Sequence, residues 1–204
     1  FIPLKGIHLN MLQEDQIRNL RDIDLLVRKK DISLVIKSLK EIGFSFKNKD
    51  YVFNSDHLED DYSYDINPMF NKHGTCIEIH YKIFRKTDCK ISESMFKTSK
   101  KFIYENQQFF LPCLEDLASH LIFHATTKQG LDNGIQIVID LVNIFEMRDF
   151  DINKLMNISV KYNIREELEI FLIILKENKL IKDYQDLELS KKYNFDKRFI
   201  KRFT

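Results

Sequence analysis

The stretch Asp22-Ile-Asp-Leu-Leu-Val-Arg28 decides the fold of this chain. Its apolar and β-branched residues are typical of a strand that is covered on at least one face. Because successive side chains of a strand point to opposite faces, Asp22 and Asp24 share one face, with Cα atoms roughly 6–7 Å apart. Two carboxylates in this arrangement can share divalent metal ions. The alternative is that Asp22 pairs with a nearby arginine and Asp24 only closes the strand.

Secondary structure is predicted on both sides of this strand. Upstream, residues 1–5 favour a short strand that Gly6 closes, and residues 7–16 favour a helix. Downstream, Asp31 is a plausible N-cap for a helix over residues 32–42, and Gly43 offers its C-terminal stop. Short alternating runs then predict a mixed or antiparallel sheet from further strands at residues 44–47, 51–54, 62–70 and 76–84.

The second half of the chain is predicted to be helical. After a stretch without a clear pattern at residues 86–101 and a β-like pair ending at Leu111, helical periodicity recurs. The expected helices cover residues 114–125, 135–145, 152–162 and 165–177. The helix over residues 135–145 is apolar nearly all round, so we expect it at the centre of this half. We therefore expect an α+β fold with a core at residues 1–111 and a helical sub-domain at residues 112–204.

Composition narrows the classes of partner and compartment. The 32 Lys and Arg against 31 Asp and Glu leave a net charge of +1, which makes nucleic acid an unlikely partner. No apolar run approaches the roughly 20 residues that span a bilayer, so we expect no membrane partner. Three widely spaced cysteines favour a reducing, cytoplasmic location. The chain begins at Phe1 without Met, so we expect that an N-terminal part of the natural protein precedes it.

A third carboxylate lies on a later predicted strand. In Ile77-Glu-Ile-His-Tyr81, Glu78 and His80 fall on one face and the apolar residues on the other. Glu78 is therefore a candidate metal ligand, with an ordinary exposed strand residue as the alternative. His80 is either a hydrogen-bonded neighbour or a residue that contacts substrate or acts as a base.

These pieces together resemble a known family. Leu4-Lys-Gly6, Arg18, the Asp22 strand, Gly43-Phe44 and the Glu78 strand occur in the order and spacing of the bacterial uncharacterised nucleotidyltransferase family, within the polymerase β-like superfamily. The resemblance extends over about residues 3–148.

The resemblance implies a fold, a reaction and a set of site residues. It implies a polymerase β-like nucleotidyltransferase core, residues 1–111, with a mixed sheet, and transfer of a nucleotidyl group from a nucleoside triphosphate such as ATP. The acceptor would be an unidentified small molecule or protein, pyrophosphate would leave, and Mg²⁺ or Mn²⁺ would be the cofactor. The residues implied for catalysis and metal binding are Asp22, Asp24 and Glu78. The residues implied for nucleotide binding are Lys5, Gly6, Arg18 and His80.

Two departures from the superfamily pattern keep other functions open. Ile7 stands where Gly or Ser is common, and Arg21 precedes Asp22 where a small residue is common. The chain could then be a catalytically silent nucleotidyltransferase fold that acts as a nucleotide- or protein-binding regulatory module. A third possibility is that the carboxylates are structural and the helical half is an interaction scaffold.

Two expectations concern stability. A carboxylate in an apolar helix is costly unless paired, so Asp140 should contact His120 or His124 of a neighbouring helix. Asp24→Asn should be tolerated by the fold, because it removes carboxylate repulsion in the metal-free protein.

Overall fold

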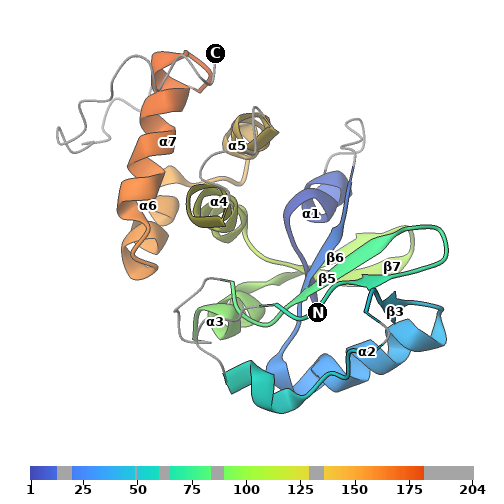
Figure 1. The fold of residues 1–204 in the computed structure, drawn as a ribbon. Coiled ribbons are helices and arrows are strands. Elements are labelled where there is room, and N and C mark those ends of the chain that lie inside the picture. The colour runs from blue at the N-terminus through green and yellow to red at the C-terminus, as the bar shows by residue number, and fades with distance from the viewer. Residues whose placement is uncertain (13–19, 49, 60–64, 84–89, 129–135, 182–204) are drawn as a thin grey trace. The chain divides into compact units, whose positions relative to one another are not determined.

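The computed structural model describes residues 1–12, 20–48, 50–59, 65–83, 90–128 and 136–181 (Figure 1). The chain divides into two compact units, Phe1–Cys113 and Leu114–Thr204, which are described separately below. Among the helices of these residues, none has the length and apolar character needed to cross a membrane.

The first unit is organised around a five-stranded sheet with the order β1-β2-β5-β4-β3. Its strands are β1 (Ile2–Pro3), β2 (Ile23–Leu26), β3 (Ser45–Phe46), β4 (Met69–Phe70) and β5 (Cys76–His80). Strands β2 and β5 run parallel, whereas β1 pairs with β2, β4 with β5 and β3 with β4 in antiparallel fashion. The sheet is therefore mixed, with the two strands that carry the predicted carboxylates side by side.

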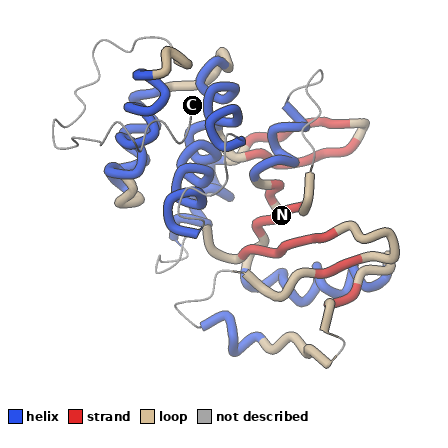
Figure 2. Tube along the Cα trace, turned by 45° about the horizontal axis from the view of Figure 1, so that its top comes forward, coloured by secondary structure: helices blue, strands red, loops and turns tan. Residues whose placement is uncertain are grey.

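Helices and a separate hairpin complete this unit. The helices are α1 (Lys5–Leu12), α2 (Ile32–Glu41) and α3 (Lys90–Thr98), with single 3₁₀ turns at Lys29–Asp31 and Ser55–Glu59. Strands β6 (Lys100–Tyr104) and β7 (Gln107–Leu111) form a two-stranded antiparallel hairpin. Figure 2 shows both sheets in red.

One face of the sheet is apolar and packs against α2. Leu25 and Val27 from the β2 segment and Ile77 and Ile79 from β5 belong to one buried cluster, to which α2 contributes Ile32, Ile36 and Leu39. Because side chains alternate along a strand, the residues between them point to the opposite face. Burial of the apolar set against α2 thus fixes the side on which Asp24 and Glu78 lie.

The end of α2 confirms the predicted stop signal. Gly43 has φ +91°, the left-handed conformation that favours glycine. The Phe44 N–H donates to the Leu39 carbonyl at 2.9 Å, and the Gly43 N–H donates to the Lys40 carbonyl at 3.0 Å. This pair of bonds is the Schellman arrangement that ends a helix. Asp31 occupies the N-cap position, but its side chain makes no capping hydrogen bond.

Two strand predictions differ from the structure. Residues 51–54 lie in a loop, where Tyr51 and Phe53 pack individually against the α2 side of the core instead of joining a strand ladder. Of the strand expected at residues 62–70, the described part is shorter, with β4 at Met69–Phe70 and an isolated bridge from Asp65 to His80.

The second unit consists of helices. They are α4 (Leu114–Phe123), followed by one π turn at His124–Lys128, α5 (Gln136–Glu146), α6 (Ile152–Lys161) and α7 (Arg165–Glu177). Helix α4 packs against α5, α6 and α7 and is the central helix of the unit. The expectation that the helix over residues 135–145 is central is wrong, since Ile139 of α5 is 43% exposed.

Helix α4 is central although it is rich in polar residues, because two of its buried carboxylates have partners on α6 and at its caps. Glu115 accepts hydrogen bonds from the Asp151 N–H at 2.9 Å and the Lys154 Nζ at 2.8 Å. Asp116 accepts one from the Tyr162 hydroxyl at 2.9 Å. Both carboxylates are buried, so these bonds offset the cost of removing them from water.

The buried carboxylate of α5 has a local partner. Asp140 accepts a hydrogen bond from the Gln136 side chain, one turn earlier, at 2.9 Å. The rings of His120 and His124 meet edge to face, with centroids 6.3 Å apart. A contact between either histidine and Asp140 stays a prediction.

The predicted fold class is confirmed: the chain is α+β, with a mixed sheet followed by a helical unit. The assignment of residues 1–111 as a catalytic core and 112–204 as a sub-domain stays a prediction.

Candidate functional site

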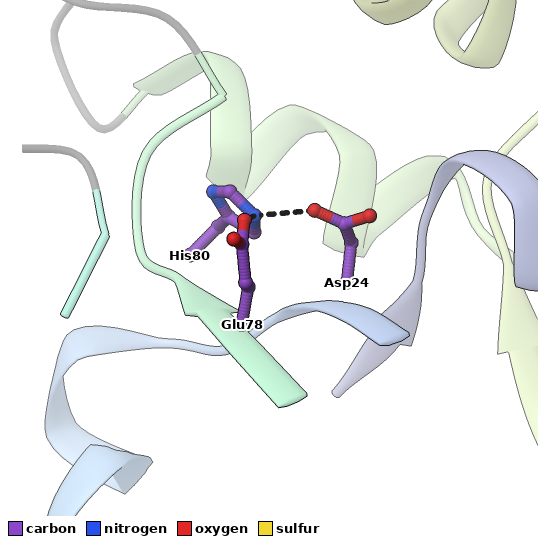
Figure 3. Close-up of side chains that lie close together, drawn as sticks. All are labelled: Asp24, Glu78 and His80. Atoms are coloured by element: carbon purple, nitrogen blue, oxygen red, sulfur yellow. Dashed lines mark hydrogen bonds and ion pairs between the residues drawn. The ribbon is translucent and has the colours of Figure 1, made fainter. Parts of the chain in front are cut away.

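The register of the two parallel strands brings the predicted site residues together. Asp24 of β2 lies opposite Glu78 of β5, and Leu26 lies opposite His80. Residues paired in register on neighbouring strands share a face of the sheet. Figure 3 shows Asp24, Glu78 and His80 pointing to the same side.

These three side chains form a group that fits a metal ion. Each offers a ligand atom, and the three atoms lie within 4.8 Å of one another. The His80 Nε2 is 2.8 Å from Asp24 Oδ1 and 3.6 Å from Glu78 Oε2. Asp24 and His80 are buried, and Glu78 is half-buried. Carboxylate oxygens are ligands that Mg²⁺ and Mn²⁺ prefer.

Lys5 also contacts the site; it is the first residue of α1, directly after the turn that follows β1. Its ammonium forms an ion pair with Asp24 Oδ1, and its side chain is only 12% exposed. The Leu4 N–H donates to the Asp24 carbonyl at 3.0 Å, which ties this turn to β2. Lys5 itself has φ +48°, an unfavourable conformation for a non-glycine residue. Gly6 is buried as the second residue of α1.

The two carboxylates of the group have pKa values shifted in opposite directions. Burial alone would raise the pKa of Asp24, but the hydrogen bond with His80 and the positive charge of Lys5 hold it well below its usual range. Burial raises the pKa of Glu78, and the negative charge of Asp24 raises it further. In the absence of metal, Asp24 is therefore fully charged, while the charged form of Glu78 is disfavoured.

Two further predicted residues remain, Asp22 and Arg18. Asp22 directly precedes β2 and is half-buried, and its charge contributes to raising the pKa of Glu78 and of Cys76. It is therefore near the site, yet His80 and not Asp22 is the third member of the group. Arg18 lies outside the described residues. The roles assigned to Asp22 and Arg18 stay predictions.

Lys82, two residues after His80, is a buried lysine that the sequence analysis did not select as a candidate site residue. It is only 5% exposed, although lysine is rarely buried. Its ammonium lies 5.6 Å from the centre of the Tyr81 ring. The signal was available, since Lys82 continues the alternation of Glu78 and His80 by one more step of two residues.

The class of the protein follows from comparison with protein families. The model of the family described as "Uncharacterised nucleotidyltransferase" matches residues 1–178, and the chain belongs to this family. A search of curated proteins finds no match. Among solved structures, the chain is similar to the lincosamide antibiotic adenylyltransferase LnuA in its lincomycin-bound crystal structure, with 16% sequence identity and a TM-score of 0.46. The similarity covers 71% of this chain and 85% of that one.

Proposed function

We propose that the chain is a metal-dependent nucleotidyltransferase that moves a nucleotidyl group from a nucleoside triphosphate, such as ATP, to a small-molecule or protein acceptor. The proposal combines membership of the nucleotidyltransferase family with the group formed by Asp24, Glu78 and His80. We propose Mg²⁺ or Mn²⁺ as the cofactor, a cytoplasmic location on the basis of the cysteine pattern, and no nucleic-acid partner.

The observation that carries the proposal is the direct pairing of Asp24 with Glu78 across parallel strands. Two carboxylates at adjacent positions repel each other, and Glu78 has a raised pKa in part for this reason. Such a pair is unfavourable in a structural role and favourable for binding a divalent cation. We propose that Asp22 supplies a further carboxylate to the same site.

In the proposed reaction, an acceptor hydroxyl oxygen forms a bond to the α-phosphorus while the bond from the α-phosphorus to the pyrophosphate oxygen breaks. A divalent ion held by Asp24 and Glu78 would supply charge neutralisation and would make the hydroxyl more acidic. His80, oriented by its hydrogen bond to Asp24, is our candidate for the base that takes the hydroxyl proton. Lys5, with Gly6 at the start of α1 and Arg18, is proposed to bind the triphosphate oxygens, including those of the departing pyrophosphate.

One observation favours a second function, a catalytically silent fold that binds a nucleotide or a protein. The ammonium of Lys5 already neutralises Asp24, and a metal ion would compete with it for the same carboxylate. Under this alternative, Mg²⁺ and a nucleotide would bind but release no pyrophosphate. The assay described next separates the two functions.

The test is the substitution Asp24→Asn, which keeps the shape of the side chain and removes its charge. We expect pyrophosphate release to fall at least 100-fold, because metal-assisted stabilisation of the transition state is worth several kcal/mol. Release is measured with a panel of nucleotides and candidate acceptors in Mg²⁺ and in Mn²⁺. Asp50→Asn, at an exposed position of the same unit, is the matched control and should keep full activity.

The contacts of Asp24 argue that Asp24→Asn lowers the stability of the fold. Asp24 is buried and bonds to both Lys5 and His80, so the loss of its charge should destabilise the fold by about 1.5–3 kcal/mol. Activity is therefore compared at a temperature where urea unfolding shows the variant to be folded. Undiminished release by folded Asp24→Asn protein would refute the mechanism, and metal-dependent nucleotide binding without release would establish the silent fold.

A further inference from the structure

A cavity of about 360 Å³ lies at the carboxyl ends of the two parallel strands. Its lining includes Arg28, two residues after β2, and Tyr81, directly after β5. Helix α3 closes the cavity with Ser92 and Phe96. This volume is in the range of small-molecule sites, and ligands of open sheets bind at the carboxyl ends of parallel strands.

The lining of the cavity carries an excess of positive charge. Arg28, Lys29 and Lys30 contribute three positive charges and Glu93 contributes one negative charge, so the excess is 3 − 1 = 2. A phosphate monoester carries about 1.5–2 negative charges at neutral pH, whereas a carboxylate carries one. The charge of the cavity therefore suits a phosphate group better than a carboxylate.

Arg28 is held in place but keeps donors for a ligand. Its guanidinium lies over the Phe96 ring, 4.2 Å from the ring centre, which restricts its orientation. Its ion pair with Glu93 is long, at 3.7 Å, and both side chains are more than a third exposed. A guanidinium has five N–H donors, and its planar fork matches two oxygens of a phosphate.

The position of the cavity relates it to the proposed active site. Arg28 has an extended backbone (φ −63°, ψ 140°), and the Val27 N–H donates to the His80 carbonyl at 2.8 Å. The β2 segment thus continues as an extended chain from Asp24 to Arg28, over roughly 13 Å for four residues. Arg28 stands four positions after Asp24, just beyond the end of β2. A small molecule could reach from one to the other.

We propose that this cavity is the subsite for the acceptor and that the acceptor is a small molecule that carries a phosphate monoester. Arg28, Lys29 and Ser92 bind the phosphate group. This inference rests on the proposed nucleotidyltransferase function and specifies the class of its acceptor. The phosphate anchors the acceptor at the cavity, while a hydroxyl of the same molecule lies toward Asp24 and Glu78.

The test uses phenyl phosphate as the probe, and its binding to the full chain is measured by isothermal titration calorimetry at constant ionic strength. Arg28→Gln should weaken binding at least tenfold, because the charged fork is lost. Lys37→Gln removes one positive charge from the exposed side of α2 and should change binding less than twofold. Lys30→Gln, at an exposed position, should weaken binding about two- to fivefold.

Two further binding experiments test whether the cavity prefers a phosphate to a carboxylate and whether the phosphate belongs to the acceptor or to ATP. Benzoate, which presents a carboxylate on the same ring, should bind at least tenfold more weakly than phenyl phosphate. Saturating ATP with Mg²⁺ should leave phenyl phosphate bound. If phenyl phosphate does not bind, if folded Arg28→Gln and Lys30→Gln both bind it like the unmodified chain, or if ATP displaces it, the acceptor subsite is refuted.

The failure of this inference can be told from the failure of the proposed function. Asp24→Asn should abolish pyrophosphate release and leave phenyl phosphate binding unchanged. If no acceptor or nucleotide supports release but Arg28-dependent binding persists, the enzyme function and the acceptor role fail together, and the cavity stands only as a phosphate site.

Discussion

Glu78 is a residue whose charge is expected to support activity and to lower the stability of the metal-free fold. Its pKa is raised by burial and by Asp24, so at neutral pH its charge destabilises the folded, metal-free protein. Glu78→Gln should therefore increase the free energy of unfolding in EDTA at pH 7, by roughly 0.2–1 kcal/mol for a like-charge pair, while abolishing activity. Urea midpoints measure this change.

The pH dependence gives this prediction its control. A group with a raised folded pKa destabilises the fold above its unfolded pKa, about 4.3 for Glu, and the effect disappears as the pH falls below that value. The stability difference between Glu78→Gln and the unmodified protein should thus vanish near pH 3. A less stable Glu78→Gln protein at pH 7 would contradict the charge argument.

His8, on α1, should determine how the free energy of unfolding changes between about pH 6.5 and pH 4. It is 1% exposed, and its Nδ1 has no hydrogen-bond partner among the residues that the structure describes. Burial lowers its pKa from 6.5 to about 3. Between these values the unfolded chain binds a proton that the folded protein does not, so stability falls as the pH decreases, by up to about 1.4 kcal/mol per pH unit.

The variant His8→Phe removes this titration and keeps a ring of similar shape. Its free energy of unfolding should depend less on pH between 6.5 and 4 than that of the unmodified protein, as measured by urea unfolding at several pH values. His73→Gln, at an exposed turn, is the control and should follow the unmodified profile. Parallel profiles for all three proteins would show that His8 is not protonated on unfolding.

At this scale the sequence predicted part of the candidate site. Strand alternation placed Asp22 and Asp24 on one face of their strand and Glu78 and His80 on one face of theirs, and the parallel register sets Asp24 opposite Glu78. The ion pair of Lys5 depends on the left-handed backbone of Lys5 itself at the start of α1, which no local pattern indicates. His80, and not Asp22, joins Asp24 and Glu78 because of the register between β2 and β5. That register pairs residues far apart in the sequence, so no local pattern shows it.

At the scale of the elements, the glycine that ends α2 allows a direct test of backbone strain. Gly43→Ala places a Cβ at φ +91°, where nothing lies within 4 Å of it, so its cost is backbone strain of about 1–2 kcal/mol. The free energy of unfolding should fall by this amount in urea titrations. Ser38→Ala, on the exposed side of the same helix, should be neutral or slightly stabilising. Equal stability of Gly43→Ala would contradict the strained cap.

Element predictions succeeded where the signal was local. The α2 helix had both apolar periodicity and a glycine stop, and α6 and α7 had periodicity over ten or more residues. The segment at residues 51–54 misled because its aromatic residues alternate as in a strand, yet they pack as single side chains on the core. Alternation reports which side chains are buried, and a strand also needs a partner.

For the molecule as a whole, the misplaced centre of the helical unit has a physical reason. Hydrophobicity favoured α5, but Glu115 and Asp116 of α4 are buried because Lys154 and Tyr162 bond to them. Their partners lie 39 and 46 residues away in the chain. Sequence patterns show which residues are polar and do not show which polar residues have distant partners.

The Asp116 to Tyr162 bond predicts the stability of this unit. Tyr162→Phe removes a hydrogen bond to a buried charged group and should destabilise the unit by about 1.5–3 kcal/mol. Tyr104→Phe, in the exposed hairpin, should change stability little. Circular dichroism during urea unfolding measures both, and equal midpoints for the two variants would show that the bond contributes nothing.

The same carboxylates link the first turn of α4 to both ends of α6. Glu115 binds the N-cap residue Asp151, and Asp116 binds Tyr162 at the C-cap. Fraying at either end of α6 therefore breaks a hydrogen bond to α4. In native-state hydrogen exchange, the terminal amides of α6 should be protected as strongly as its middle and should exchange together with α4 as one cooperative opening unit.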